Sequence, residues 1–291
     1  MTPGPQAALL PDGRRLHLHH GPIDLIVEAF GDRDEVAAAY RQAVARFDDI
    51  LPTLASELPM LRTAVAAPRW APHGPVARRM VAACWPHRAT FVTPMAAVAG
   101  AVADEMLAAL VAGRTVARAY VNNGGDIAFH LAPGESLSLG VVGDVDAPLI
   151  DATAALSHDL PVRGVATSGW SGRSFSLGIA DAVTVLAADA AAADVAATLI
   201  ANAIDVDHPA VARQPARDID PDSDLGDRPV TVAVGDLDDT SIDAALESGV
   251  AVARRMREAG LVYAAVLVLK RRFRIVGDVP APGRIASGRS A

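Results

Sequence analysis

The sequence predicts an α+β protein, in which an antiparallel sheet packs against helices and a β-α-β extension follows at the C-terminal end. Strand-like segments joined by short turns alternate along the chain with helices rich in small residues. Hydrophobic residues make up 51% of the chain and aromatic residues only 4%, so Ala, Val and Leu must form the core by close packing. With 291 residues the chain can bury a large core, as one large domain or as two lobes.

The first part of the chain predicts a hairpin followed by helices. Residues 14–30 alternate in polarity on both sides of a Gly-Pro turn, which is typical of two paired strands. Apolar residues recur every three or four positions over 34–51, which predicts a helix. Pro52 and Pro59 are expected to interrupt helical structure beyond residue 51, and a helix over 75–85 begins at a proline that suits its first turn.

The next helix, over about 93–112, is predicted mainly by its ends. Thr93 is a candidate N-cap, Pro94 suits the first turn and Gly113 suits the end of the helix. Small residues let another backbone or a ligand approach closely, and this helix has many of them: Ala96, Ala97, Ala99, Gly100, Ala101 and Ala103. Tight packing on a sheet and ligand binding both explain this composition.

Further strands and one helix complete the predicted core. Residues 116–131 form two strands around an Asn-Asn-Gly-Gly-Asp turn, and residues 190–204 form an alanine-rich helix. Apolar and β-branched runs predict four other strands, over 137–142, 162–167, 175–179 and 182–187.

We expect the core to span residues 14–204. Residues 205–228 contain seven Asp and three Pro, which favours a solvated acidic linker. A strand at 229–235, a helix at 240–259 and a long strand at 261–276 form the β-α-β extension of the same body, over 229–277. The tail over 278–291 and a short leader at residues 1–11 are expected to be disordered.

Charge and composition argue against several classes of function. The net charge is −8 and the basic residues are scattered, which disfavours nucleic acid or an anionic membrane as the main partner. No apolar run is expected to reach the roughly 18 residues of a membrane span. The single Cys84 lies in an apolar stretch and is expected to be a buried, inert thiol. The absence of a signal-like segment predicts a cytoplasmic protein, and the alanine-rich surface is compatible with a homodimer.

Two segments combine glycine with small polar side chains at the end of an apolar run. In the first, Asn122, Asn123 and Asp126 surround the pair Gly124-Gly125, and in the second, Thr167, Ser168 and Gly169 end a strand. Glycine lets backbone N–H groups point at a phosphate or carbonyl, and these side chains add donors without bulk. A plain hairpin turn explains Gly-Gly equally well when the first segment is taken alone.

A third segment, residues 192–198, carries Asp194 and Thr198 four positions apart. On a helix their oxygens lie on one face, where they can hold a hard cation such as Mg²⁺. An N-terminal helix charge and a surface hydroxyl are the alternative interpretation.

These segments, in this order, resemble the ApbE family of FAD-dependent flavin transferases. Residues 93–104 are similar to the family's helix opening and small-residue run, and residues 122–127 to its Asn-x-Gly-Gly-Asp turn. Residues 165–169 resemble its Ala-Thr-Ser-Gly strand end, and residues 193–198 its Ala-Asp-x-x-Ala-Thr metal motif. The resemblance covers about residues 90–204 well, and it points to a divergent branch of the family.

The resemblance implies an ApbE-like, tunnelling-type core that binds FAD or FMN. The family moves FMN from FAD to a Thr or Ser hydroxyl of an acceptor protein, with Mg²⁺. By carry-over the turn 122–126 lines the flavin site and residues 167–169 lie beside it. Asp194, Thr198 and the backbone carbonyl of Ala96 ligate the metal.

The chain also departs from the family pattern, and the departures argue against transfer. Ala99 replaces a family Lys, so a cation near the phosphates is missing. The family's His and Pro-Arg-Thr-Gly loop are absent where residues 176–181 run on toward a strand. Two alternatives to a Mg²⁺-assisted flavin transferase stay open. One is a non-catalytic flavin- or nucleotide-binding module that serves a partner enzyme, and the other is a metal-dependent hydrolase of a pyrophosphate-containing ligand.

Overall fold

A computed structural model describes residues 4–142 and 150–279, and its centre is a nine-stranded sheet. The strand order is β1-β2-β3-β4-β5-β8-β9-β12-β13, and every pairing between neighbours is antiparallel. The strands run over Gln6–Leu9 (β1), Leu16–His20 (β2), Ile23–Gly31 (β3), Val116–Asn123 (β4), Asp126–Leu131 (β5), Gly164–Ser168 (β8), Ala182–Ala187 (β9), Ala264–Leu269 (β12) and Arg272–Val276 (β13). The predicted α+β class with an antiparallel sheet is confirmed.

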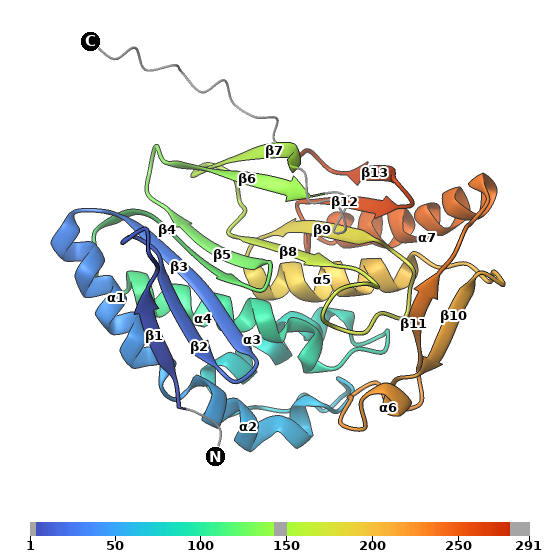
Figure 1. Cartoon of the computed structure of the whole chain (residues 1–291), viewed down its shortest axis with the longest axis horizontal. Coiled ribbons are helices and arrows are strands. Elements are labelled where there is room, and N and C mark those ends of the chain that lie inside the picture. Colours follow the sequence, from blue (N-terminus) through green and yellow to red (C-terminus); the bar gives the residue numbers. More distant parts are fainter. Residues whose placement is uncertain (1–3, 143–149, 280–291) are drawn as a thin grey trace, which may run out of the picture.

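The helices cover one face of this sheet (Figure 1). The helical layer contains α1 (Arg33–Phe47), α2 (Ile50–Leu61), α3 (Pro75–Cys84), α4 (Val98–Val111), α5 (Ala190–Ala203) and α7 (Asp239–Glu258), with 3₁₀ turns η1 (Trp85–His87) and η2 (Pro94–Ala97). The short helix α6 (Ala216–Ile219) lies apart from this layer, beside β10 (Val211–Pro215). The larger hydrophobic cluster lies between the sheet and the helical layer. A smaller cluster, with Phe129 and Leu156, lies on the opposite face beside the hairpin of β6 (Ser136–Val142) and β7 (Ile150–Ser157).

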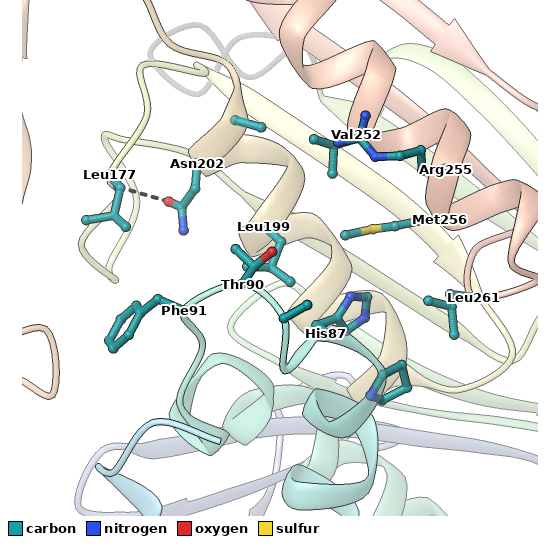
Figure 2. A pocket seen from close by; sticks show the side chains of 13 residues that line it. His87, Thr90, Phe91, Leu177, Leu199, Asn202, Val252, Arg255, Met256 and Leu261 are labelled. Carbon is teal, nitrogen blue, oxygen red and sulfur yellow. Dashed lines mark hydrogen bonds between the residues drawn. The ribbon is translucent and has the colours of Figure 1, made fainter. Parts of the chain in front are cut away.

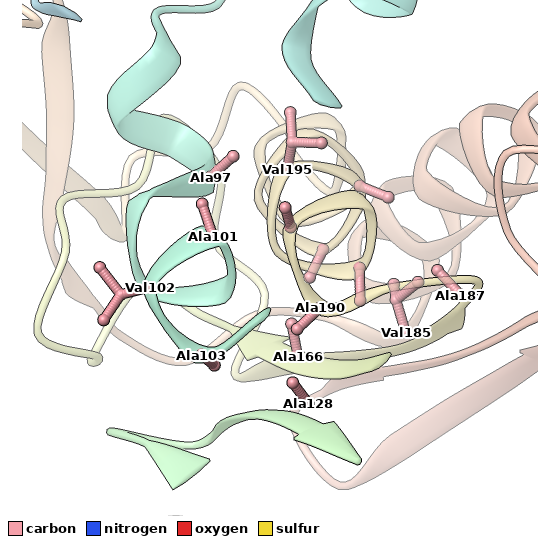
Figure 3. Packing of buried hydrophobic residues seen from close by; sticks show 14 of the residues in the cluster. Ala97, Ala101, Val102, Ala103, Ala128, Ala166, Val185, Ala187, Ala190 and Val195 are labelled. Atoms are coloured by element: carbon pink, nitrogen blue, oxygen red, sulfur yellow. The ribbon is translucent and has the colours of Figure 1, made fainter. Parts of the chain in front are cut away.

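Small side chains let α4 and α5 lie almost against each other and against the strands. Figure 3 shows Ala101 and Ala103 of α4 and Ala190 of α5 above Ala166 and Ala128 of the sheet. A Cβ at Gly100 would stand 2.2 Å from the carbonyl oxygen of Ala190, and one at Gly164 would stand 2.0 Å from the carbonyl carbon of Asp189. Tight packing therefore explains much of the small-residue composition.

Several local predictions were wrong. Pro52 lies in the first turn of α2, where its missing N–H would have no helical partner, and Pro59 lies inside the same helix. Residues 175–179 form no strand. The expected leader contains β1, which pairs with β2. The expected linker 205–228 contains α6 and β10 (Val211–Pro215), which pairs with β11 (Pro229–Val234).

The long C-terminal strand expected over 261–276 is instead the hairpin β12–β13. Lys270 and Arg271 have φ of +47° and +64° and form its turn. The charged Lys-Arg-Arg run inside an apolar stretch was the available signal. The division at residues 204 and 228 stays a prediction, and the expected disordered tail falls largely on residues 280–291, outside the described part of the chain.

The prediction that no segment reaches the length of a membrane span was also wrong. Residues 94–111, which form η2 and α4, are long and apolar enough, with a mean hydropathy of 1.5, and half of the segment is buried. This segment packs against α1, α3, α5, β4 and β5, which is the environment of a core helix. The cytoplasmic location stays a prediction.

Candidate functional site

The Gly124-Gly125 pair closes the tight hairpin between β4 and β5. Asn123 pairs with Asp126 across the turn, and the two glycines have φ of +65° and +113°, which side-chain-bearing residues rarely adopt. The side-chain oxygen of Asn122 accepts a hydrogen bond of 2.9 Å from the N–H of Gly125. Turn geometry thus accounts for the glycines and for one of the two asparagines.

Alternation along β4, β5 and β8 divides the predicted ligand residues between two faces of the sheet. Asn123 and Asp126 lie on the helix-covered face with Val121 and Ala128, and alternation in β8 puts Ser168 there with Ala166. Asn122 and Thr167 lie on the other face, where the hydroxyl of Thr167 is 2.9 Å from that of Thr184. The structure does not bring all the predicted ligand residues together.

On the helix-covered face, the turn meets the start of α4 and the first half of α5. The side-chain amide of Asn123 donates to the carbonyl oxygen of Ala99 at 3.0 Å, and the N–H of Gly100 donates to Asp194 at 3.0 Å. The N–H of Thr167 donates to Asp126 at 3.3 Å. The predicted flavin turn and the predicted metal motif therefore meet at Ala99-Gly100.

Two acids, Asp126, which is buried, and Asp194, which is partly exposed, lie at this point. Burial raises the pKa of Asp126 to about 7, against the opposing hydrogen bond from Thr167. Burial also raises the pKa of Asp194, and the neighbouring charge of Asp126 raises it further, against the N–H of Gly100. Neither carboxyl has a basic partner among the described residues. An unneutralised pair of carboxyls is a donor set that suits a hard cation.

Thr198 and Ala96 are the other two predicted metal ligands. Thr198 lies one turn after Asp194 on α5, and both are partly exposed in a helix whose other residues are mostly buried. Ala96 lies in η2, which packs against α5. Within residues 4–142 and 150–279, no three His, Cys, Asp or Glu side chains could hold a metal ion together. The predicted metal ligands include only one side chain of these four types, that of Asp194. The metal site therefore stays a prediction.

Asp104 has a structural role that its sequence position left open. Its two carboxyl oxygens accept hydrogen bonds from the N–H groups of Ala190 and Ala191, at 3.0 and 2.8 Å. It therefore caps the N-terminus of α5 from α4. Burial raises the pKa of Asp104 to about 6, although these two hydrogen bonds oppose the shift.

The loop 169–181 lies beside the turn and brings to it an arginine, Arg173, that belongs to none of the sequence motifs. Arg173 Nη1 is 3.3 Å from the point where a Cβ on Gly124 would stand. The loop is anchored by Asp181, which accepts from the indole N–H of Trp170 at 3.2 Å and from the N–H of Lys270 at 2.5 Å. Gly169 packs on this anchor, because a Cβ there would meet the Asp181 carbonyl oxygen at 2.2 Å.

The acidic segment 205–228 contacts the residues that immediately precede η2. Thr93 does not cap the helix with its side chain, because its hydroxyl donates to Asp224. The Arg228 guanidinium lies over the Phe91 ring, 3.4 Å from the ring centroid. Part of the segment is therefore packed against the helical layer rather than solvated.

Cys84 is fully buried, as the sequence predicted. Burial raises the pKa of its thiol, which keeps the sulfur protonated.

Comparison with known proteins places the chain in a family. The sequence model of a family described as AbpE bacteria matches residues 7–279. UPF0280 proteins of Methanopyrus kandleri and Methanothrix thermoacetophila are 43% identical over 127 residues and 38% identical over 135 residues. These alignments cover 43% and 46% of this chain and 48% and 54% of those proteins, so the chain spans about half the length of the curated relatives it matches.

Among solved structures, the apo form of the Pseudomonas stutzeri flavinyl transferase ApbE aligns with 86% of this chain and 74% of that chain. The sequence identity is 15% and the TM-score is 0.35.

Proposed function

The chain belongs to the ApbE-like family described as AbpE bacteria, and on that premise we propose that it binds a flavin nucleotide, FAD or FMN, together with Mg²⁺. The observation that carries the proposal is the pair of interacting carboxyls of Asp126 and Asp194, which lacks a basic partner among the described residues. A divalent cation beside Asp194 would neutralise this pair and attract the phosphates of a nucleotide. Thr198 and the carbonyl of Ala96 would complete the protein's share of the metal ligands.

The nucleotide would lie at the surface of the β4–β5 turn. Asn123 and Asp126 border this place from the helix-covered face, and Ser168 and Gly169 border it from the end of β8. Arg173 reaches the turn from the loop and supplies a positive charge near the phosphates, which the family's Lys would have supplied at Ala99.

Transfer of FMN to an acceptor protein is the reaction that family membership favours. A second function, binding without turnover in the service of a partner enzyme, is favoured by Ala99 and by the absence of the His and Pro-Arg-Thr-Gly loop. A third function, hydrolysis of a pyrophosphate-containing ligand, would need only water as acceptor.

One experiment separates the three functions. The purified chain is incubated with FAD and MgCl₂, with and without a Thr-bearing acceptor protein, and FMN and AMP are measured by chromatography. Product that requires the acceptor supports transfer, product without it supports hydrolysis, and FAD binding without product supports the module. Failure to bind FAD or FMN in the presence of Mg²⁺ would contradict the proposal as a whole.

A further inference from the structure

The second half of α5 borders a cavity that none of the sequence motifs pointed to. Its volume is about 440 Å³, and it lies between α5, α7, the segment 86–91 and the loop residue Leu177. Small-molecule pockets commonly have volumes of about 300–1,000 Å³. Figure 2 shows side chains from these four parts of the chain facing the same space.

The walls of the cavity are mostly apolar. Six hydrocarbon or thioether side chains supply most of the larger surfaces: Phe91, Leu177, Leu199, Val252, Met256 and Leu261. An open space with such walls favours a ligand with a hydrophobic body, because removing apolar surface from water is favourable for both partners.

The only charge that lines the cavity is positive, and its other polar groups can donate hydrogen bonds. Among its lining residues Arg255 is the one cation, and no Asp or Glu is present. Arg255 is exposed and forms no ion pair within the described part of the chain. Burial lowers the pKa of His87, which keeps its imidazole neutral and able to donate one hydrogen bond.

Asn202 adds a donor whose orientation is fixed. Its side-chain oxygen accepts hydrogen bonds from the N–H of Leu177 at 2.9 Å and from the hydroxyl of Ser176 at 3.2 Å. The amide nitrogen therefore points away from Leu177, as Figure 2 shows. The hydroxyl of Thr90 lies on the same side of the cavity.

We propose that this cavity binds a small, mostly apolar molecule that carries one anionic group, with the anion at Arg255. A medium-chain carboxylate has this chemistry. Asp194 and Asn202 are eight residues apart on α5, about 12 Å at 1.5 Å per residue, so the cavity is separate from the nucleotide site. The proposal requires neither metal nor nucleotide.

The test compares three ligands with the same chain and different head groups. Decanoate, decanol and decylammonium are titrated into the full chain by calorimetry, with EDTA and without nucleotide. Decanoate is expected to bind at least about tenfold more tightly than the other two, a difference of about 1.4 kcal/mol. Equal affinity for the three, or no binding of decanoate, would overturn the proposal whatever the result with FAD.

Variants then place the site. Arg255→Gln is expected to weaken decanoate binding by at least about tenfold, whereas Arg254→Gln, which changes an exposed neighbour outside the cavity, leaves it unchanged. Ala203→Phe is expected to fill the cavity and abolish binding, with its folding checked by circular dichroism. If Ala203→Phe does not fold, the arginine pair decides alone. Unchanged binding in Arg255→Gln or in folded Ala203→Phe would exclude this cavity.

Discussion

The two halves of helix α5 border regions of opposite chemistry. The first half meets α4 with almost no side chain between the backbones, and the charge of Asp126 acts on its Asp194. The second half borders a cavity with apolar walls, one arginine and no acid. The first region favours a cation and the groups that a cation attracts, whereas the second favours a hydrophobic anion. A single helix can serve both regions because side chains four or eight positions apart share a face but lie one or two turns apart.

The largest effect is expected from breaking the first region at Gly100. In Gly100→Val, even the Cβ would stand 2.2 Å from the carbonyl oxygen of Ala190, so α4 and α5 must separate. We expect the free energy of unfolding, measured in urea by circular dichroism, to fall by at least about 3 kcal/mol, the upper end for ordinary overpacking. Gly4→Ala, where nothing lies within 4 Å, is the control and should unfold as the wild type does. Equal stability of both variants would contradict the close approach of the helices.

A pH series tests the buried acids of the first region. The pKa of Asp104 is raised to about 6 and that of Asp126 to about 7, from an ordinary value of 3.8. Between the ordinary pKa of 3.8 and these raised pKa values, the folded chain binds more protons than the unfolded chain. The free energy of unfolding of the metal-free protein should therefore fall as the pH rises from about 4 to about 7.

The expected fall is on the order of 3 kcal/mol for Asp104 alone, at 1.36 kcal/mol per pKa unit. Asp126→Asn, whose amide oxygen can still accept from Thr167, should make the fall smaller. A free energy of unfolding that stays constant or rises over this pH range in the presence of EDTA would show that the pKa values of these carboxyls are not raised.

Removal of one carboxylate should separate the two regions functionally. In Asp194→Ala we expect Mg²⁺-dependent binding of FAD, measured by equilibrium dialysis, to weaken by at least about tenfold, or 1.4 kcal/mol. Binding of decanoate at the other half of α5 should not change. Asp159→Ala, which removes an exposed acid, is the control. Unchanged Mg²⁺ dependence in Asp194→Ala would show that Asp194 is not a metal ligand and that it serves only to accept the hydrogen bond from the N–H of Gly100.

Smaller effects are expected from the neutral and the exposed groups around the same site. Thr198→Ala should weaken Mg²⁺-dependent binding severalfold, because a hydroxyl contributes less to the affinity for a hard cation than a carboxylate does.

Arg173→Gln should also weaken nucleotide binding severalfold. It should make binding less sensitive to salt, because salt screens the attraction between an exposed charge and the phosphates. A salt dependence equal to that of the wild type would exclude Arg173 from the phosphate site.

Local patterns determined most of the secondary structure of this chain. Alternating polarity identified the hairpin of β2 and β3, and the Asn-Asn-Gly-Gly-Asp segment identified the turn between β4 and β5. These features depend on residues that are neighbours in the sequence, so their signal is visible without the fold. The strand expected at 175–179 failed because an apolar run can also be a buried loop, and Ile179 and Ala180 are buried in one.

The sequence by itself also determined the family and the order of the candidate motifs along the chain. It left open whether the small residues of 96–103 serve packing or a ligand. The tertiary structure shows that Gly100 serves packing, because it lies against the backbone of Ala190.

Only the tertiary structure decided which motif residues meet. The antiparallel sheet turns Asn123 and Asp126 toward α4 and α5, and it turns Asn122 and Thr167 away from them. Arg173 and the cavity beside Arg255 likewise depend on segments that are distant in sequence and adjacent in space. Burial by such distant segments is what raises the pKa of Asp126 and Asp194, and no local pattern of residues contains that information.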